Sequence, residues 1–428
     1  MRAARQALQR ALGDDPDFLK LWSGGFVSTL GFHISALAMQ LTAAVVLSAN
    51  PFEMGVLGAA QYLPRFLLGL PAGAWVDRVR RRPLMIVADL GRAGLLASIP
   101  IAHVLGWLGM PQLYVVALGM GAFSTFFEVS ILSYLPALVG RPHLVEANSR
   151  LHAGEAVAQV GGPNIAGILV QWLTAPIAIG VDAISYVVSA LFLAAIRRPE
   201  PARTAHVAGG RPLWAEIREG VGVVTRHALL RPLVATGITV GLFTGGVRGA
   251  LIVVYLVEIG VTPIEFGLIY GVGGGIALIG AIVARPVARG LGLGRTLIGA
   301  QLVAAAFAAF VPLAGLAPGA SLAILLAGQV GLGLAAPIWG VNSGSLQQVV
   351  TPDRLLGRVT ATQRFAVAGV HPVGAIFGGW LASTIGLQST LAIAAAGAAL
   401  GALWLAVSPV LQLAQMPVPV EVADGPAR

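Results

Sequence analysis

Long apolar stretches alternate along the chain with short segments rich in charge, proline and glycine. A helix needs about 20 apolar residues to cross the roughly 30 Å hydrocarbon core of a bilayer. Twelve stretches reach that length, and we interpret each as a transmembrane helix. The predicted spans are residues 18–48, 54–76, 84–107, 112–138, 151–172, 177–196, 232–257, 264–288, 295–315, 320–349, 358–383 and 387–409.

The composition supports this pattern. Of the 428 residues, 57% are hydrophobic and only 11% are charged, which is too little charge to cover a soluble domain. Membrane helices tolerate many Gly and Pro residues, here 56 and 26. The absence of cysteine excludes disulfides and thiolate chemistry. No metal-ligand spacing, phosphate loop or hydrolase arrangement is found, so we expect no enzyme, no cofactor and no metal, and the polar N-terminus predicts no cleaved targeting peptide.

The basic residues orient the spans. If the N-terminus is cytoplasmic, all but three of the 27 Lys and Arg residues fall in the termini, in the inner loops or at the inner ends of the spans beside them, as the positive-inside rule requires. The exceptions, Arg65, Arg92 and Arg248, lie within spans. This distribution places both termini in the cytoplasm and explains the net charge of +9 without a nucleic-acid partner.

The longest polar stretch separates six spans from six. We predict an N-terminal bundle (1–196), a cytoplasmic linker (197–231), a C-terminal bundle (232–410) and a cytoplasmic tail (411–428). The second part of the linker has apolar residues at helical spacing (Leu213, Ile217, Val221 and Val224), which favours an amphipathic helix on the inner membrane face, although a solvated linker is an alternative.

The two halves also share a short sequence. Pro51-Phe-Glu-Met-Gly opens the second span, and Pro263-Ile-Glu-Phe-Gly opens the eighth, 212 residues later. Internal repeats with a substrate site between them are typical of secondary transporters. The predicted fold is therefore all-α, with twelve transmembrane helices in two pseudo-symmetric six-helix bundles.

The loop after the second span reads Gly73-Ala-Trp-Val-Asp-Arg-Val-Arg-Arg-Arg-Pro83. Gly73 would let another helix approach closely, Asp77 could lie against a helix N-terminus, and Arg78, Arg81 and Arg82 would anchor the loop inside. The loop resembles motif A of the major facilitator superfamily, G-x-x-x-D-R-x-G-R-R, which implies a role in the conformational cycle. The alternative is that these arginines are only a topology signal.

The fifth span contains Gly162-Pro163-Asn-Ile-Ala-Gly167. Small residues allow tight helix packing, and Pro163 removes one backbone hydrogen bond. The segment resembles motif C of the same superfamily, G-x-x-x-G-P-x-x-G-G, which implies export by proton antiport. Packing without any coupling role is the alternative.

Shorter strings extend the resemblance over nearly the whole chain, among them Tyr134-Leu-Pro136, Leu144-Val-Glu-Ala-Asn-Ser149 and Pro352-Asp-Arg-Leu-Leu-Gly-Arg358. They are similar to the drug/proton antiporter branch that holds bacterial macrolide efflux proteins and enterobactin exporters. The resemblance implies a secondary exporter of a small amphipathic molecule in the bacterial inner (cell) membrane, driven by a proton gradient. We expect a monomer. An importer or siderophore/lipid facilitator of the same fold, and a non-transporting membrane sensor, stay open as alternatives.

Charges inside a membrane span need a partner, a cavity or a function. Arg65 in span two and Glu128 in span four both lie well inside the bilayer. Glu128 is the first candidate for the coupling proton, since burial favours a neutral carboxyl, and Arg65 could be its counter-charge or contact an anionic substrate. A purely structural ion pair is the alternative.

The remaining intramembrane groups allow several roles. Asp89 and Arg92, spaced i, i+3, are interpreted as a structural pair nearer the cytoplasm that supports the motif A region. Asp182, in the outer third of span six, could serve coupling or packing. His33, His371 and Arg248 are further candidates for the proton pathway or substrate cavity, with simple hydrogen bonding or snorkelling as the alternative.

Overall fold

The computed structural model describes residues 15–76, 78–198, 200 and 213–417. All regular elements of these residues are helical. The chain forms two compact units, which are described separately. Unit 1 comprises residues 1–206 and 260–271, and unit 2 comprises residues 207–259 and 272–428. Residues 201–212 of the predicted linker and 418–428 of the predicted tail lie outside the described part.

The helices of unit 1 follow the predicted spans. They are α2 (Pro16–Leu41, continued by the π-helical η1, Thr42–Val46), α3 (Pro51–Val76), α4 (Arg81–Val104), α5 (Met110–Val139), α6 (Leu144–Leu173) and α7 (Ala175–Ala194), with a 3₁₀ turn, η2 (Arg141–His143), before α6. The first turns of α11 (Pro263–Leu291) also belong to this unit.

Unit 2 begins with the short helix α8 (Leu213–Arg226) within the predicted linker. It continues with α9 (Leu230–Val240), the π-helix η3 (Gly241–Arg248), α10 (Gly249–Glu258), the rest of α11, α12 (Leu293–Ala308), α13 (Phe310–Ala314), η4 (Pro318–Ala320), α14 (Ser321–Val350), α15 (Asp353–Ile385), α16 (Leu387–Ala406) and η5 (Pro409–Gln412).

Ten helical stretches among the described residues are long and apolar enough to cross a membrane. They match ten of the predicted spans, with α9–η3–α10 forming one stretch and α12–α13 another. The other two predicted spans are held by α3 and α6, which have 26 and 30 residues but carry more polar side chains, such as Arg65 in α3. The chain is thus an all-helical membrane protein with ten to twelve spanning helices.

Local chemistry explains where several helices begin. Asp15 is the N-cap of α2: its Oδ1 accepts hydrogen bonds from the N–H groups of Asp17 (3.0 Å) and Phe18 (3.3 Å). Pro16 fits the first helical position, where an N–H has no intrahelical partner.

The repeated Pro-x-Glu sequence forms the same cap in both halves. Before α3, Asn50 and Glu53 exchange side chain-to-backbone hydrogen bonds, each 2.9 Å long. Before α11, Glu265 accepts from the N–H of Thr262 (2.7 Å) and donates its own N–H to the Thr262 hydroxyl (3.4 Å). Both are capping boxes, which fix the first turn of a helix. The shared sequence therefore has a shared structural role.

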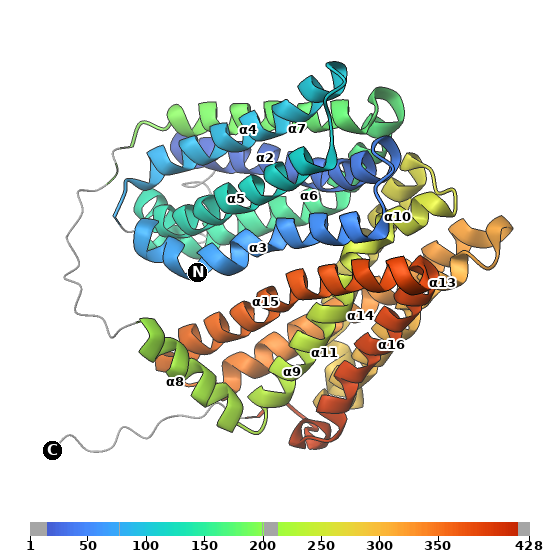
Figure 1. The fold of residues 1–428 in the computed structure, drawn as a ribbon. Helices are drawn as coiled ribbons and strands as arrows, with labels where there is room; N and C mark the ends of the chain where they lie inside the picture. Colours follow the sequence, from blue (N-terminus) through green and yellow to red (C-terminus); the bar gives the residue numbers. More distant parts are fainter. Residues whose placement is uncertain (1–14, 77, 199, 201–212, 418–428) are drawn as a thin grey trace. The chain divides into compact units, whose positions relative to one another are not determined.

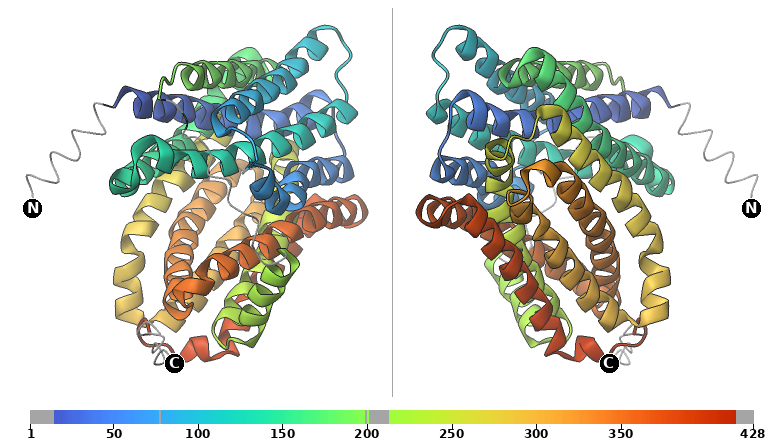
Figure 2. Two further views of the ribbon diagram at one scale, coloured as in Figure 1. Left: turned by 90° about the vertical axis from the view of Figure 1, so that its left-hand side faces the viewer. Right: turned by 90° about the vertical axis from the view of Figure 1, so that its right-hand side faces the viewer.

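In unit 1, α7 packs against both α2 and α4, while α5 packs against α3 and α4. Figures 1 and 2 show α2, α4 and α7 side by side. Buried apolar side chains fill the space between these helices near one end of the unit, including Phe18, Met85, Phe127 and Tyr134. The functional groups described below lie on these same helices.

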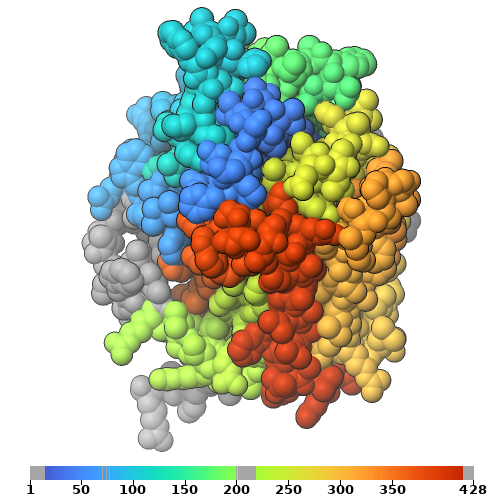
Figure 3. Space-filling view, turned by 45° about the vertical axis from the view of Figure 1, so that its right-hand side comes forward, coloured from blue at the N-terminus to red at the C-terminus, as the bar shows by residue number. Residues whose placement is uncertain are grey.

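In unit 2, α12 packs against α14 and α16, and α15 packs against η3. Figure 3 shows α16, in red, on the same face as the gold and orange helices α12 and α13. The linker helix α8 packs against the start of α15, where Arg358 forms an ion pair with Glu219 (2.8 Å). Val224 of α8 is buried and Val221 is exposed.

Candidate functional site

An ion pair joins the charged side chains of spans two and four. Arg65 of α3 donates from Nη2 to Oε2 of Glu128 on α5, and the two helices pack along each other. The side chains are 56% and 50% exposed. Because charges that face lipid are costly, we expect this face of α3 and α5 to border water or other polar groups.

A second group of charges is enclosed in the core of unit 1, where α4 packs against α5 and α7. Asp89 is fully buried and Arg92 is nearly so. Arg92 Nη2 donates to Asp89 Oδ1. The guanidinium carbon lies 4.4 Å from the ring centre of Phe127 on α5 and 4.2 Å from that of Tyr186 on α7. Two cation–π contacts therefore help to hold the guanidinium in place.

Asp182 of α7 lies beside this pair and is also fully buried. The hydroxyl of Ser185 donates to its Oδ1 at 2.7 Å, and the hydroxyl of Ser35 on α2 faces the same carboxyl. The backbone of α2 comes very close at this point, since a methyl group at Gly31 would overlap both Asp182 and Ser185. We refer to Asp89, Arg92 and Asp182 as the Asp–Arg–Asp cluster.

The sequence did not predict this cluster. The interpretation treated Asp89 and Arg92 as one pair and Asp182 as a separate group, whereas in the structure the charges of Asp89 and Arg92 act on Asp182. One signal was present: Asp182, Ser185, Tyr186 and Ser189 follow the i, i+3, i+4, i+7 spacing of one helix face. A polar stripe on an otherwise apolar span indicates a polar neighbour.

The motif A loop differs in part from its prediction. Asp77 lies outside the described residues. Gly73 was predicted to admit a neighbouring helix, and a methyl group there would meet no atom of the described residues within 4 Å, so the described part shows no close helix contact at this glycine. Arg78 is exposed, and its N–H closes a turn onto the carbonyl of Trp75 (2.9 Å).

Arg81 and Arg82 connect the start of α4 to the end of α7. Arg82 Nε donates to the carbonyl of Leu193 at 2.8 Å, and its Nη2 donates to that of Ala194. The carboxylate of Glu200 accepts the backbone N–H of Arg81 (3.0 Å) and that of Arg82 (3.5 Å). A cation at a helix C-terminus and an anion at an N-terminus both interact favourably with the helix dipole.

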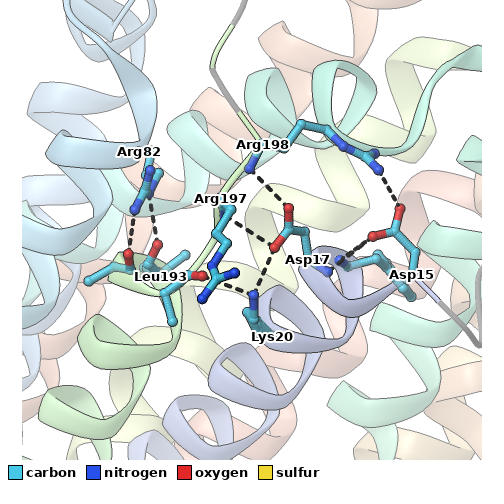
Figure 4. A network of polar contacts seen from close by, with 10 residues as sticks. Asp15, Asp17, Lys20, Arg82, Leu193, Arg197 and Arg198 are labelled. Carbon is cyan, nitrogen blue, oxygen red and sulfur yellow. Dashed lines mark hydrogen bonds and ion pairs between the residues drawn. The ribbon is translucent and has the colours of Figure 1, made fainter.

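The same end of unit 1 holds a network centred on Asp17 (Figure 4). Its carboxylate accepts the N–H groups of Arg197 (3.2 Å) and Arg198 (3.0 Å) and pairs with Lys20 (2.9 Å). The Arg198 side chain pairs with Asp15 at 3.1 Å. These contacts tie the start of α2 to the segment that follows α7.

The motif C residues lie where α6 meets two other helices of unit 1. Gly162 faces α2, and a methyl group there would overlap His33. A methyl group at Gly167 would overlap the carbonyl of Pro263 at the start of α11. Pro163 lies within α6 between them. Small residues thus set both helix contacts, as the pattern predicts for packing.

Three intramembrane candidates remain: His33 in α2 of unit 1, and Arg248 and His371 in unit 2. The ring of His33 makes an edge contact with Phe32, with ring centres 5.5 Å apart. In unit 2, His371 packs against Gly245 of η3, and half-buried Arg248 ends that π-helix. Among the residues that the structure describes, no group of three His, Asp or Glu side chains could hold a metal ion.

Comparison with known proteins agrees with this architecture. The sequence matches the model of the Major Facilitator Superfamily over residues 21–371. It is 27% identical to the multidrug efflux pump Tap of Mycolicibacterium fortuitum over 80% of this chain and 84% of Tap. It is 24% identical to macrolide efflux protein A of Streptococcus pyogenes over 87% of this chain and 90% of that protein.

Solved structures show the same fold. A bacterial homologue of the iron transporter ferroportin, in its inward-facing state, superposes with a TM-score of 0.72 at 17% identity, covering 91% of this chain and 98% of that one. At this identity the likeness concerns the fold alone. The family match covers most of the chain and confirms the superfamily that the sequence resembles. The protein belongs to the Major Facilitator Superfamily, and it is a multi-pass secondary transporter rather than an enzyme.

Proposed function

We propose that this protein exports a small amphipathic molecule by proton antiport, as a monomer in the bacterial cell membrane. The observation that carries the proposal is the Arg65–Glu128 ion pair on the spanning helices α3 and α5. A half-exposed carboxylate inside the membrane can exchange a proton with water and respond to the charge beside it. Protonation of Glu128 would break the pair and free Arg65.

The direction of transport is supported by two further observations. The motif C residues of α6 pack against α2 and α11, so that a bend at Pro163 would act on both contacts. Two relatives over most of the chain, Tap and macrolide efflux protein A, are named as efflux proteins. An exporter of drugs, antibiotics or secondary metabolites agrees with both.

The test uses purified protein in proteoliposomes with an imposed pH gradient, and ethidium and erythromycin as probes. We expect wild-type protein to accumulate at least one probe against its gradient, and a protonophore to abolish that accumulation. Transport that needs no pH gradient, or that runs only in the import direction, would refute proton-driven export. A susceptibility panel of host cells with and without the gene extends the test to further compounds.

A further inference from the structure

We propose that the Asp–Arg–Asp cluster is a proton-binding site in which Asp182 carries one proton while Asp89 and Arg92 stay paired. The inference rests on the proton antiport proposed above, because it identifies residues that would hold the coupling proton. It adds a second proton site, enclosed within unit 1, to the half-exposed Glu128.

The charge balance of the cluster carries the argument. Two carboxyl groups and one guanidinium are enclosed together, and Asp89 and Asp182 are both 0% exposed. With both acids ionised, the group would have a net charge of −1 where water cannot reach it. An uncompensated charge in a protein interior is so costly that the group takes up a proton instead. One bound proton makes the cluster neutral.

The hydrogen bonds assign that proton to Asp182. Asp89 accepts directly from Arg92, which favours its ionised form. Asp182 instead receives a neutral hydroxyl donor, Ser185, at 2.7 Å. Oδ2 of each acid is buried without a hydrogen-bond partner among the described residues, so the partner of Oδ1 decides between them: the cation on Asp89 favours its ionised form, and the proton falls to Asp182.

The groups that face the cluster come from three helices, α2, α5 and α7. From α2, the hydroxyl of Ser35 faces Asp182. From α5, the ring of Phe127 lies against the guanidinium of Arg92. From α7, the ring of Tyr186 also lies against it, and Ser189 faces Asp89. The charges that act on Asp182 are those of Arg92 and Asp89.

This arrangement couples the proton to helix packing. Loss of the proton from Asp182 would leave two carboxylates to share the Arg92 guanidinium, which contacts the rings of Tyr186 and Phe127. The backbone of α2 touches Asp182 at Gly31, so a movement of this carboxyl toward Arg92 changes the contact between α2 and α7. Release of the proton from Asp182 would therefore alter the packing of α2 against α7 at this point.

The decisive measurement is infrared difference spectroscopy of the purified full-length protein, titrated between neutral and alkaline pH without any transported probe. Wild type should show the C=O band of a buried carboxylic acid at neutral pH. Asp182→Asn should lose this band, whereas the control Glu128→Gln should keep it. Persistence of the band in folded Asp182→Asn, or its absence from wild type, would overturn the assignment.

A second variant covers the case in which Asp182→Asn does not fold. Ser185→Ala removes only the hydroxyl donor, so the band should stay but shift in frequency. An unshifted band would place the protonated acid elsewhere.

Transport then separates this inference from the proposed function. In proteoliposomes, Asp182→Asn should retain probe exchange without a gradient and lose pH-driven accumulation down to the level seen without a gradient, while Asp182→Glu should partly restore it. If wild type accumulates neither ethidium nor erythromycin, proton-driven export fails while the infrared result still decides the proton site. If accumulation is normal in Asp182→Asn, the cluster is not the coupling site.

Discussion

The Arg65–Glu128 pair gives the prediction with the clearest magnitude. Glu128→Gln leaves the guanidinium without its partner in a spanning helix. Exposed ion pairs contribute about 0.2–1 kcal/mol, and breaking a fully buried pair costs about 3–5 kcal/mol. Since the two side chains are 56% and 50% exposed, solvent screening places the cost between these limits. We expect either Glu128→Gln or Arg65→Gln to destabilise unit 1 by roughly 1–2 kcal/mol.

The double variant Arg65→Gln/Glu128→Gln separates the energy of the ion pair from the effects of each single substitution. With both charges removed, no unpaired group is left, so the double variant should recover about 1 kcal/mol relative to the sum of the two single changes. A loss of 1 kcal/mol lowers the Tm of a unit of this size by roughly 2–4 °C. Thermal unfolding followed by intrinsic fluorescence resolves such shifts. Arg141→Gln, which changes an exposed charge at the start of η2, is the control and should leave the Tm unchanged.

Additive losses in the double variant would show that the two charges do not stabilise each other. Transport tests the coupling role separately: Glu128→Gln mimics the protonated acid, so it should still exchange ethidium downhill but no longer accumulate it in response to a pH gradient. Full gradient-driven accumulation by this variant would mean that the proton travels elsewhere. The Asp–Arg–Asp cluster is then the first alternative.

Three further predictions concern local structure. Thr174 joins α6 to α7 with φ 76° and ψ 156°, a backbone conformation that strains a residue with a side chain and that Gly386 adopts between α15 and α16. Thr174→Gly should therefore raise the free energy of unfolding by about 1 kcal/mol in a thermal melt. An unchanged or lower Tm would show that Thr174 is not strained. His227 Nδ1 accepts the N–H groups that begin α9, and burial lowers the pKa of this ring, so its neutral form stabilises the fold above the usual pKa of 6.5 and this contribution is lost as the pH falls through the lowered pKa. His227→Ala should therefore cost about 1 kcal/mol at pH 7.5 and flatten the dependence of Tm on pH below 6.5. Wild-type and variant Tm profiles that run parallel with pH would exclude this role of His227 as a cap. Glu265→Ala should cost roughly 0.5–1 kcal/mol by opening the capping box of α11, while Glu265→Gln, which keeps the acceptor, should cost less; equal melts for the two variants would show that the box does not matter.

Much of the fold follows from span length and charge. The predicted stretches coincide with helices because a bilayer leaves a chain few alternatives to a fully hydrogen-bonded helix. Span length and charge did not predict the interruptions within individual spans. The seventh span contains the π-helix η3, rich in glycine, and the ninth breaks between α12 and α13, near Pro312. Hydropathy measures how apolar a stretch is and contains no information on its hydrogen-bond register.

Of the charged groups, the sequence predicted one pairing and missed the other. Arg65 and Glu128 were predicted as possible partners because each stood out alone in its span. Asp89 and Arg92 explained each other at i, i+3 spacing, so nothing in the sequence required a third member. A helix of 3.6 residues per turn fixes which side chains share its own face, but not which neighbouring helix that face meets.

The position of each charged residue along its span could have predicted that Asp89, Arg92 and Asp182 meet. Asp182 lies near the middle of α7, as Asp89 and Arg92 do in α4. Charges at the same depth on different spans can meet only if their helices are neighbours, and α4 and α7 are extensively packed together. Since an unpaired charge at mid-membrane is costly, equal depth and opposite sign together predict adjacent helices. Intramembrane charges, measured from helix centres rather than loop ends, therefore constrain which spans pack against each other.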